Sequence, residues 1–340
     1  MSFSFNMAMF VELSAYFSSA CSLVAVFANL WLIGLVRTVA PAEMGQYSKL
    51  IICNAINLIF FSLLHAFVQP IISIEKNVLY VFSAKNYLKL GKKVMEVLMA
   101  GYGATYCMGL VTCSVMFVYR HNLMCRKATN RLDTNFKIYL LIALILVSGA
   151  FWGSCIYLLA PPTPYVDSII STSLTQFYGL NLTNVTYVAA VYEIIDPATK
   201  HAEYNWISIF MGGSFLCIIG SSMVVSLWCA NEIRKKSKEP NGTQRSGMFE
   251  VIQKQLYNAL RVQVIVPYIF VFTPILGVLI CPIFQLNGNV AYSCVSVLVS
   301  IYPVVDPIAF MLLITRFREQ ICPKRVGVEA EGQSMEMGQR

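Results

Sequence analysis

Residues 97–120, VLMAGYGATYCMGLVTCSVMFVYR, carry no charge until the arginine that ends the stretch. At about 1.5 Å per residue, such a helix spans the roughly 30 Å hydrocarbon core of a bilayer. Glycine, alanine and serine alternate with tyrosine and threonine. Small residues let membrane helices approach closely, and hydroxyl groups hydrogen-bond between them. The stretch therefore predicts a buried membrane helix with Arg120 at one end.

The whole chain has the composition of a polytopic membrane protein. Of its 340 residues, 57% are hydrophobic and 12% are charged, about half the charged share of a soluble domain. The net charge of +8 gathers in loops between apolar runs, so we expect it to set topology and expect no nucleic-acid partner. The 11 cysteines show no metal-site spacing, and we expect no metal or cofactor.

Seven apolar runs follow one another along the chain. The uncharged run 262–305 is too long for one span, and the turn cluster QLNGN divides it. We predict an all-α membrane protein, a seven-transmembrane helix bundle at 13–315, with an N-terminal segment at 1–12 and a tail at 316–340. The predicted helices cover about 13–36, 50–74, 97–119, 138–160, 205–230, 262–284 and 290–315.

Two features orient the predicted bundle. Nineteen of the 25 Lys and Arg residues fall in the tail and in the loops on the same side of the membrane as the tail. The positive-inside rule places this side in the cytosol. Two glycosylation sequons begin at Asn181 and Asn184, in the long loop 161–203 on the other side. We therefore predict an extracellular N-terminus, a cytosolic C-terminus and glycans on both asparagines. The sequon at Asn241 falls on the cytosolic side and is expected to stay unused.

Short motifs from the second to the seventh helix resemble those of nematode str-type serpentine chemoreceptors, in the G-protein-coupled receptor superfamily. These motifs are MGQYSKLI at 44–51, FVYRH at 117–121 and YPVVDP at 302–307. The resemblance implies a chemosensory, olfactory-type receptor at the plasma membrane of a sensory-neuron cilium. Its implied partners are a small odorant or soluble chemical cue and a heterotrimeric G protein.

The resemblance assigns coupling and activation to Arg120 with Tyr119, and to Asp306 with Pro307. A tyrosine replaces the acid that usually precedes this arginine, so the usual ion pair cannot form, and Glu250 is a candidate substitute. Each assignment has a simpler alternative. In the simpler alternative for Arg120, the side chain only anchors the helix at the membrane surface. In the simpler alternative for Asp306, the carboxylate is only a hydrogen-bonding partner at the proline kink.

The tail begins with a segment, RFREQ, that we expect to form an amphipathic helix on the bilayer. Cys322, just after it, is a candidate palmitoylation site. A plain flexible tail is the alternative for the residues that follow.

Aromatic residues near the outer ends of the helices are the candidates for ligand binding. Tyr102 and Tyr106 share a face of helix three, and Trp206 and Phe210 share a face of helix five. Thr273 of helix six joins them by position and resemblance. Ordinary helix packing is the alternative for each. Because no acid lies deep in helix three, we expect a small neutral ligand rather than a cation.

Other classes of membrane protein remain as alternatives, foremost a transporter or a ligand-gated channel. A transporter predicts internal repeats, which we do not find, although Pro267 and Pro274 interrupt helix six. An enzyme needs a catalytic set within the spans, and a lone His65 and a lone Asp306 on separate helices do not supply one. We therefore expect no enzymatic activity. The paired sequons argue against an odorant channel with its N-terminus inside.

Overall fold

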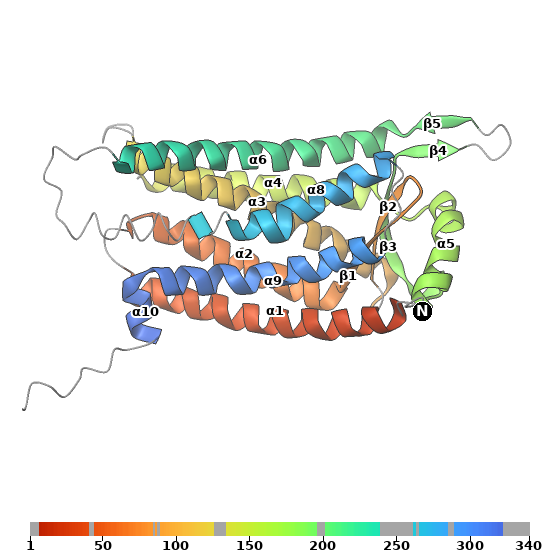
Figure 1. The fold of residues 1–340 in the computed structure, drawn as a ribbon, viewed down its shortest axis with the longest axis horizontal. Coiled ribbons are helices and arrows are strands. Elements are labelled where there is room, and N and C mark those ends of the chain that lie inside the picture. The colour runs from red at the N-terminus through yellow and green to blue at the C-terminus, as the bar shows by residue number, and fades with distance from the viewer. Residues whose placement is uncertain are drawn as a thin grey trace, which may run out of the picture.

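A computed structural model of the chain describes residues 7–40, 44–83, 86, 89–125, 134–195, 201–238, 261–262, 265–284 and 289–321. Figure 1 shows long helices running side by side along one axis. The described α-helices are α1 (Met7–Thr38), α2 (Tyr47–Val68), α3 (Lys92–Cys125), α4 (Asn135–Leu159), α5 (Pro164–Tyr178), α6 (Trp206–Lys238), α8 (Thr273–Ile280), α9 (Asn289–Leu313) and α10 (Thr315–Ile321). Six of these helices are long and apolar enough to cross a membrane, and Ile265–Ile280 is a shorter apolar helical segment.

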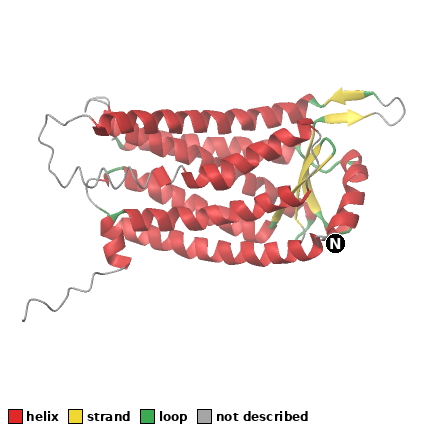
Figure 2. Ribbon diagram, in the orientation of Figure 1, coloured by secondary structure: helices red, strands yellow, loops and turns green. Residues whose placement is uncertain are grey.

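Short strands gather at the end of the bundle where the N-terminus lies (Figure 1, and by secondary structure in Figure 2). β1 (Pro70–Glu75), β2 (Val78–Ser83) and β3 (Thr186–Val191) form an antiparallel sheet in that order. β4 (Glu193–Ile195) pairs with β5 (Ala202–Tyr204). We name the sheet β1–β3 together with α5 the cap. The opposite end, where α10 lies, is the far end.

The second helix ends earlier than the sequence predicted. We expected it over 50–74, but α2 stops at Val68, because Gln69 has a left-handed backbone (φ 45°) and Pro70 cannot continue a helix. The chain then turns back as β1, whose three isoleucines suit a strand. Lys76, also at positive φ (53°), starts the tight turn into β2. One charge-free run thus contains both a helix and a strand.

The loop expected over 161–203 contains a helix of its own. Thr163 caps α5, because its hydroxyl oxygen accepts a first-turn N–H at 3.3 Å, and Gly179 ends the helix at φ 66°. Tyr178, the last residue of α5, donates its hydroxyl to a serine of β1 at 3.1 Å and lies 3.2 Å from the hydroxyl of Ser293 on α9. These bonds tie the cap to the bundle.

Helices α3 and α4 approach each other closely through glycine. A Cβ atom added at Gly153 would lie 2.9 Å from the Cβ of Ala104 and 3.2 Å from the carbonyl oxygen of Ala100. One turn earlier, a Cβ at Gly149 would lie 3.1 Å from the carbonyl oxygen of Ala104. Small residues four apart are a common means of close packing in membranes. The same interface includes Gly103 on α3, where a Cβ would meet the side chain of Ile156.

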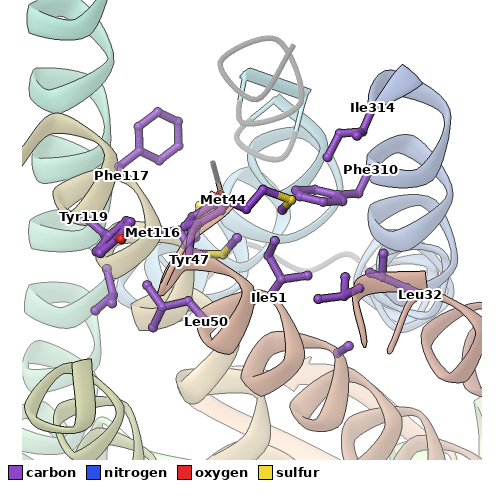
Figure 3. Packing of buried hydrophobic residues seen from close by; sticks show 14 of the residues in the cluster. Leu32, Met44, Tyr47, Leu50, Ile51, Met116, Phe117, Tyr119, Phe310 and Ile314 are labelled. Atoms are coloured by element: carbon purple, nitrogen blue, oxygen red, sulfur yellow. The ribbon is translucent and has the colours of Figure 1, made fainter. Parts of the chain in front are cut away.

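The far end has its own hydrophobic core, shown in Figure 3. Met44 lies just before α2, and Tyr47 is its first residue. Both pack in one cluster with Phe310 of α9 and with Ile314, which follows the last residue of α9. Phe317 of α10 is fully buried in the same cluster. The short helix α10 is therefore held against the bundle by its aromatic side chain.

Candidate functional site

A cavity of about 150 Å³ lies at the cap end of the bundle. The three strands of the cap sheet supply part of its lining, and the rest comes from α2, α3, α4, α6, α8, α9 and the residues around them. Its lining is almost wholly apolar and includes no charged residue. The aromatic and methionine side chains that α3, α4 and α6 contribute to the lining are Met99, Tyr102, Tyr106, Trp152, Met211 and Phe215. The cavity is built by the packing of elements far apart in the sequence.

The predicted ligand-binding residues divide into two groups. Tyr102 and Tyr106 line the cavity. Trp206 and Phe210 lie on the outer surface of α6, 72% and 60% exposed, and neither lines the cavity. Thr273 is also exposed, and its hydroxyl donates to a backbone carbonyl of its own helix at 2.8 Å. Trp206, Phe210 and Thr273 are therefore not part of the candidate site.

The reason lies in the rotation of α6 about its axis. Trp206 and Phe210 are four residues apart and share one face, whereas Met211 and Phe215 share another with the same spacing. Both faces are apolar, since one meets the hydrophobic surroundings and the other the cavity. Trp152 and Phe215, which the sequence analysis did not single out, form a stacked pair in the wall, with centroids 4.1 Å apart and planes at 8°.

Both predicted tyrosines are held by hydrogen bonds. The hydroxyl of Tyr102 lies 3.2 Å from Nδ1 of the fully buried His65, and its ring stacks on Phe61 at 4.9 Å. His65 thus positions Tyr102 and does not itself line the cavity. The hydroxyl of Tyr106 donates to the backbone carbonyl of Val271, in helix six, at 3.3 Å. One cavity tyrosine is therefore bonded to helix two and the other to helix six.

A further tyrosine lines the cavity from the chain just after β3. Tyr192 is 9% exposed, and its backbone N–H donates to the carbonyl of Asn77 at 3.1 Å. Its own carbonyl accepts from the N–H of Asn205 at 2.9 Å. Burial raises the pKa of Tyr192 to about 12, so its hydroxyl stays protonated at neutral pH. No local pattern marks Tyr192 as a cavity residue, because its position depends on the pairing of the cap strands.

Helix six is irregular where it meets Tyr106. Between Pro267 and Pro274 the backbone forms η4, a π-helix over Tyr268–Phe272. Its signature is the N–H of Thr273, which bonds to the carbonyl five residues earlier. Prolines remove backbone donors, and a π-turn is one way for a helix to accommodate the loss. The irregular backbone hydrogen bonding of helix six therefore lies between the two prolines, in the segment to which Tyr106 donates its hydrogen bond.

Arg120 lies near the far end of α3 and is almost fully buried, at 1% exposed. Its guanidinium carbon sits 4.0 Å from the ring centroid of Tyr47, a cation–π contact. Tyr47 in turn stacks on Tyr119, with centroids 5.7 Å apart and planes at 16°. The tyrosine beside the arginine therefore joins an aromatic stack instead of an ion pair. The proposed substitute Glu250 lies outside the described residues.

Two asparagines from other helices donate hydrogen bonds to α9, the seventh helix of the sequence prediction. Asp306 is 2% exposed, and its carboxylate accepts from Nδ2 of Asn54 on α2 at 3.0 Å. Pro307 has no N–H, so the carbonyl of Pro303 one turn earlier loses its helical partner. Nδ2 of Asn29 on α1 donates to that carbonyl at 3.1 Å. Asp306 thus has a hydrogen-bond partner on α2, and the carbonyl that Pro307 leaves without a helical donor has one on α1.

The modification sites fall in different parts of the molecule. Asn181 and Asn184 are exposed on η3 (Leu182–Asn184) and the residue before it, next to α5 and β3 at the cap end. Cys322 and Asn241 lie outside the described residues.

Comparisons with known proteins agree with this architecture. The family model for "Serpentine type 7TM GPCR chemoreceptor Str" matches residues 14–322. "Serpentine receptor class r-10" of Caenorhabditis elegans is 29% identical over 308 residues, 88% of each chain. "G-protein coupled receptor str-33" of the same nematode is 23% identical over 311 residues, 90% of this chain and 89% of the relative. Squid rhodopsin is similar in fold, with a TM-score of 0.62 at 11% identity over 92% of this chain and 85% of that one.

Proposed function

Because the chain belongs to the Str family of serpentine seven-transmembrane G-protein-coupled chemoreceptors, we propose that it senses a small neutral chemical that binds in the cavity at the cap end. The observation that carries this proposal is the apolar cavity of about 150 Å³ inside a seven-helix bundle. The receptor would pass the signal to a heterotrimeric G protein at the far end, beside Arg120.

The size and lining of the cavity argue for the class of ligand. A dry apolar cavity of about 150 Å³ in another protein is known to hold benzene, so compact molecules of that size fit here. No charged residue lines the cavity. A charged ligand would lose its hydration without gaining a partner, which is costly in an apolar site. An uncharged odorant or soluble cue fits both constraints.

We propose that the cap end faces outward and the far end faces the cytosol. The sequons at Asn181 and Asn184 are exposed at the cap end, on the same side as the N-terminus. The exposed basic residues Arg234 and Lys235 lie near the other end of α6, where the positive-inside rule expects cytosol. We further propose that the chain is a multi-pass glycoprotein of the plasma membrane, with a sensory cilium as its expected site.

Transmission requires that the ligand favour one of two arrangements of the helices. Tyr106 is both a wall of the cavity and a hydrogen-bond donor to the π-segment of helix six. A ligand that displaces its ring would therefore act on the irregular part of that helix. We propose that the inner end of helix six then moves outward and lets the G protein reach Arg120.

The first test of the cavity is a dose–response series. Cells that express the receptor are screened with small volatile compounds, and an active compound is titrated against two variants by second-messenger output. Tyr102→Ala should raise the effective concentration at unchanged surface level. Phe210→Ala is the matched control, since Phe210 is an exposed aromatic outside the cavity. Equal effects of both changes would move the ligand site elsewhere.

The second test addresses coupling. Arg120→Ala should abolish the second-messenger response while ligand binding and surface level persist. A normal response from this variant would make Arg120 a membrane anchor. A ligand-gated channel or a receptor independent of G proteins would then be the better assignment.

A further inference from the structure

The polar groups of the cavity differ in whether they already have partners. The hydroxyls of Tyr102 and Tyr106 are engaged with His65 and with a helix-six carbonyl. Within the part of the chain that the structure describes, the hydroxyl of Tyr192 and the indole N–H of Trp152 have no hydrogen-bond partner. Both side chains line the cavity and are more than nine-tenths buried. A donor without a partner inside the chain can bond an acceptor that enters the cavity, for a net gain of about two- to tenfold in affinity.

The two donors are also held in place. The Tyr192 ring lies across α6 at Gly212, where an added Cβ would be 3.2 Å from the tyrosine hydroxyl. Its backbone is bonded on both sides, as described above. The Trp152 ring is fixed by its stack on Phe215, and its Nε1 lies 3.6 Å from where a Cβ at Gly103 would be. Each donor thus lies against a glycine of a neighbouring helix, Gly212 on α6 and Gly103 on α3.

We propose that the ligand carries a hydrogen-bond acceptor which Tyr192 and Trp152 recognise, and that Tyr192 is the main determinant of specificity. This inference rests on the proposed ligand cavity and narrows its ligand class to compact, uncharged acceptors. The apolar part of the ligand then lies against the tyrosines of α3, whose hydroxyls are engaged elsewhere. A site built to hydrogen-bond a ligand group discriminates strongly against an analogue that lacks it, because the donor stays unpaired.

Pyridine and benzene test the inference, since they are alike in size and differ by one acceptor nitrogen. Their dissociation constants are measured by saturation-transfer NMR on the purified receptor in nanodiscs, with empty nanodiscs subtracted. Tyr192→Phe should weaken pyridine binding by about two- to tenfold and change benzene binding by less than twofold. Tyr157→Phe is the matched control, because Tyr157 on α4 is 44% exposed and does not line the cavity.

Trp152→Phe keeps an aromatic ring against Phe215 but removes the indole N–H together with the second ring. It serves as a second variant if Tyr192→Phe folds poorly, and its readout is the ratio of pyridine to benzene binding, because the lost ring area affects both probes. It should also weaken pyridine selectively. If both variants bind pyridine and benzene in the same ratio as the unmodified receptor, the acceptor inference is overturned while the cavity stands. If neither probe binds the unmodified receptor, the inference fails together with the proposed cavity.

Discussion

The contact between Arg120 and Tyr47 predicts a receptor variant that signals without ligand. In the proposed coupling step a G-protein helix needs the guanidinium of Arg120, which here lies 4.0 Å from the Tyr47 ring centroid in a buried site. Tyr47→Leu removes the ring and with it the cation–π contact to the arginine. Tyr47→Phe keeps an aromatic face and should keep the restraint. We therefore expect raised basal output from the first variant only.

The magnitude follows from the burial of the pair. A desolvated cation–π contact is worth about 2 kcal/mol, and 1.4 kcal/mol is a factor of ten in an equilibrium constant. Losing the contact would shift the balance of the two arrangements about 30-fold. If the active arrangement holds about 1% of the unliganded receptor, a usual share for a minor state, its share rises to about 20%. Basal output should rise in proportion.

The assay is second-messenger output without ligand, divided by the surface level of each variant. Tyr47→Leu should give many times the basal output of the unmodified receptor, and Tyr47→Phe should stay within about twofold of it. The double variant with Arg120→Ala should be silent, because the restraint matters only if the arginine couples. Unchanged or reduced basal output in Tyr47→Leu at equal surface level would refute the reasoning.

Three further predictions test topology and packing. Asn181→Gln and Asn184→Gln should each remove one glycosidase-sensitive shift on a gel, and a protein without any such shift would contradict an outward-facing cap. Gly153→Ala should lower the melting temperature by a few degrees, because its Cβ has no room against α3, whereas Gly213→Ala, with open space around it, should not. Asn29→Leu should cost about 1–3 kcal/mol by orphaning a buried carbonyl of α9, and a melting curve unchanged from that of the unmodified receptor would show that the bond is dispensable.

The family and the seven-helix fold were predictable from the sequence, and both are confirmed by the comparisons. Apolar runs and the charges that bound them are local properties, and a bilayer imposes one length on every span. The FVYRH and YPVVDP motifs are local as well, since each lies within one helix. Local patterns of this kind are legible without any knowledge of how the helices meet.

The cap was not predictable in the same way. The charge-free run through Pro70 suggested one long helix, since charge marks where a span must end and says nothing of a strand that follows at once. Pro70 and the β-branched residues after it were the available signal, and the left-handed turn at Gln69 was not. The pairing of β2 with β3 joins residues more than 100 positions apart, which no local pattern specifies.

The prediction of the cavity-lining residues on α6 was wrong for a related reason. An aromatic stripe such as Trp206 and Phe210 shows that a helix has an apolar face, but in a membrane every face can be apolar. Which face turns inward depends on neighbours, and here Met211 and Phe215 face the cavity. Tyr102 and Tyr106, chosen for their shared face near the outer end of helix three, do line the cavity, and their role in ligand binding stays a prediction.

Two helices that meet at the cavity differ in regularity, α3 and helix six. Tyr106 and Arg120 are 14 residues apart on α3, about 21 Å along a helix that contains no proline. Helix six begins its π-segment directly after Pro267, and the hydrogen bond from Tyr106 falls within that segment. A change at the cavity therefore has little means of bending α3, whereas it acts on helix six where backbone bonding is already irregular. We therefore expect α3 to hold the arginine in place and helix six to be the part that moves in the proposed activation.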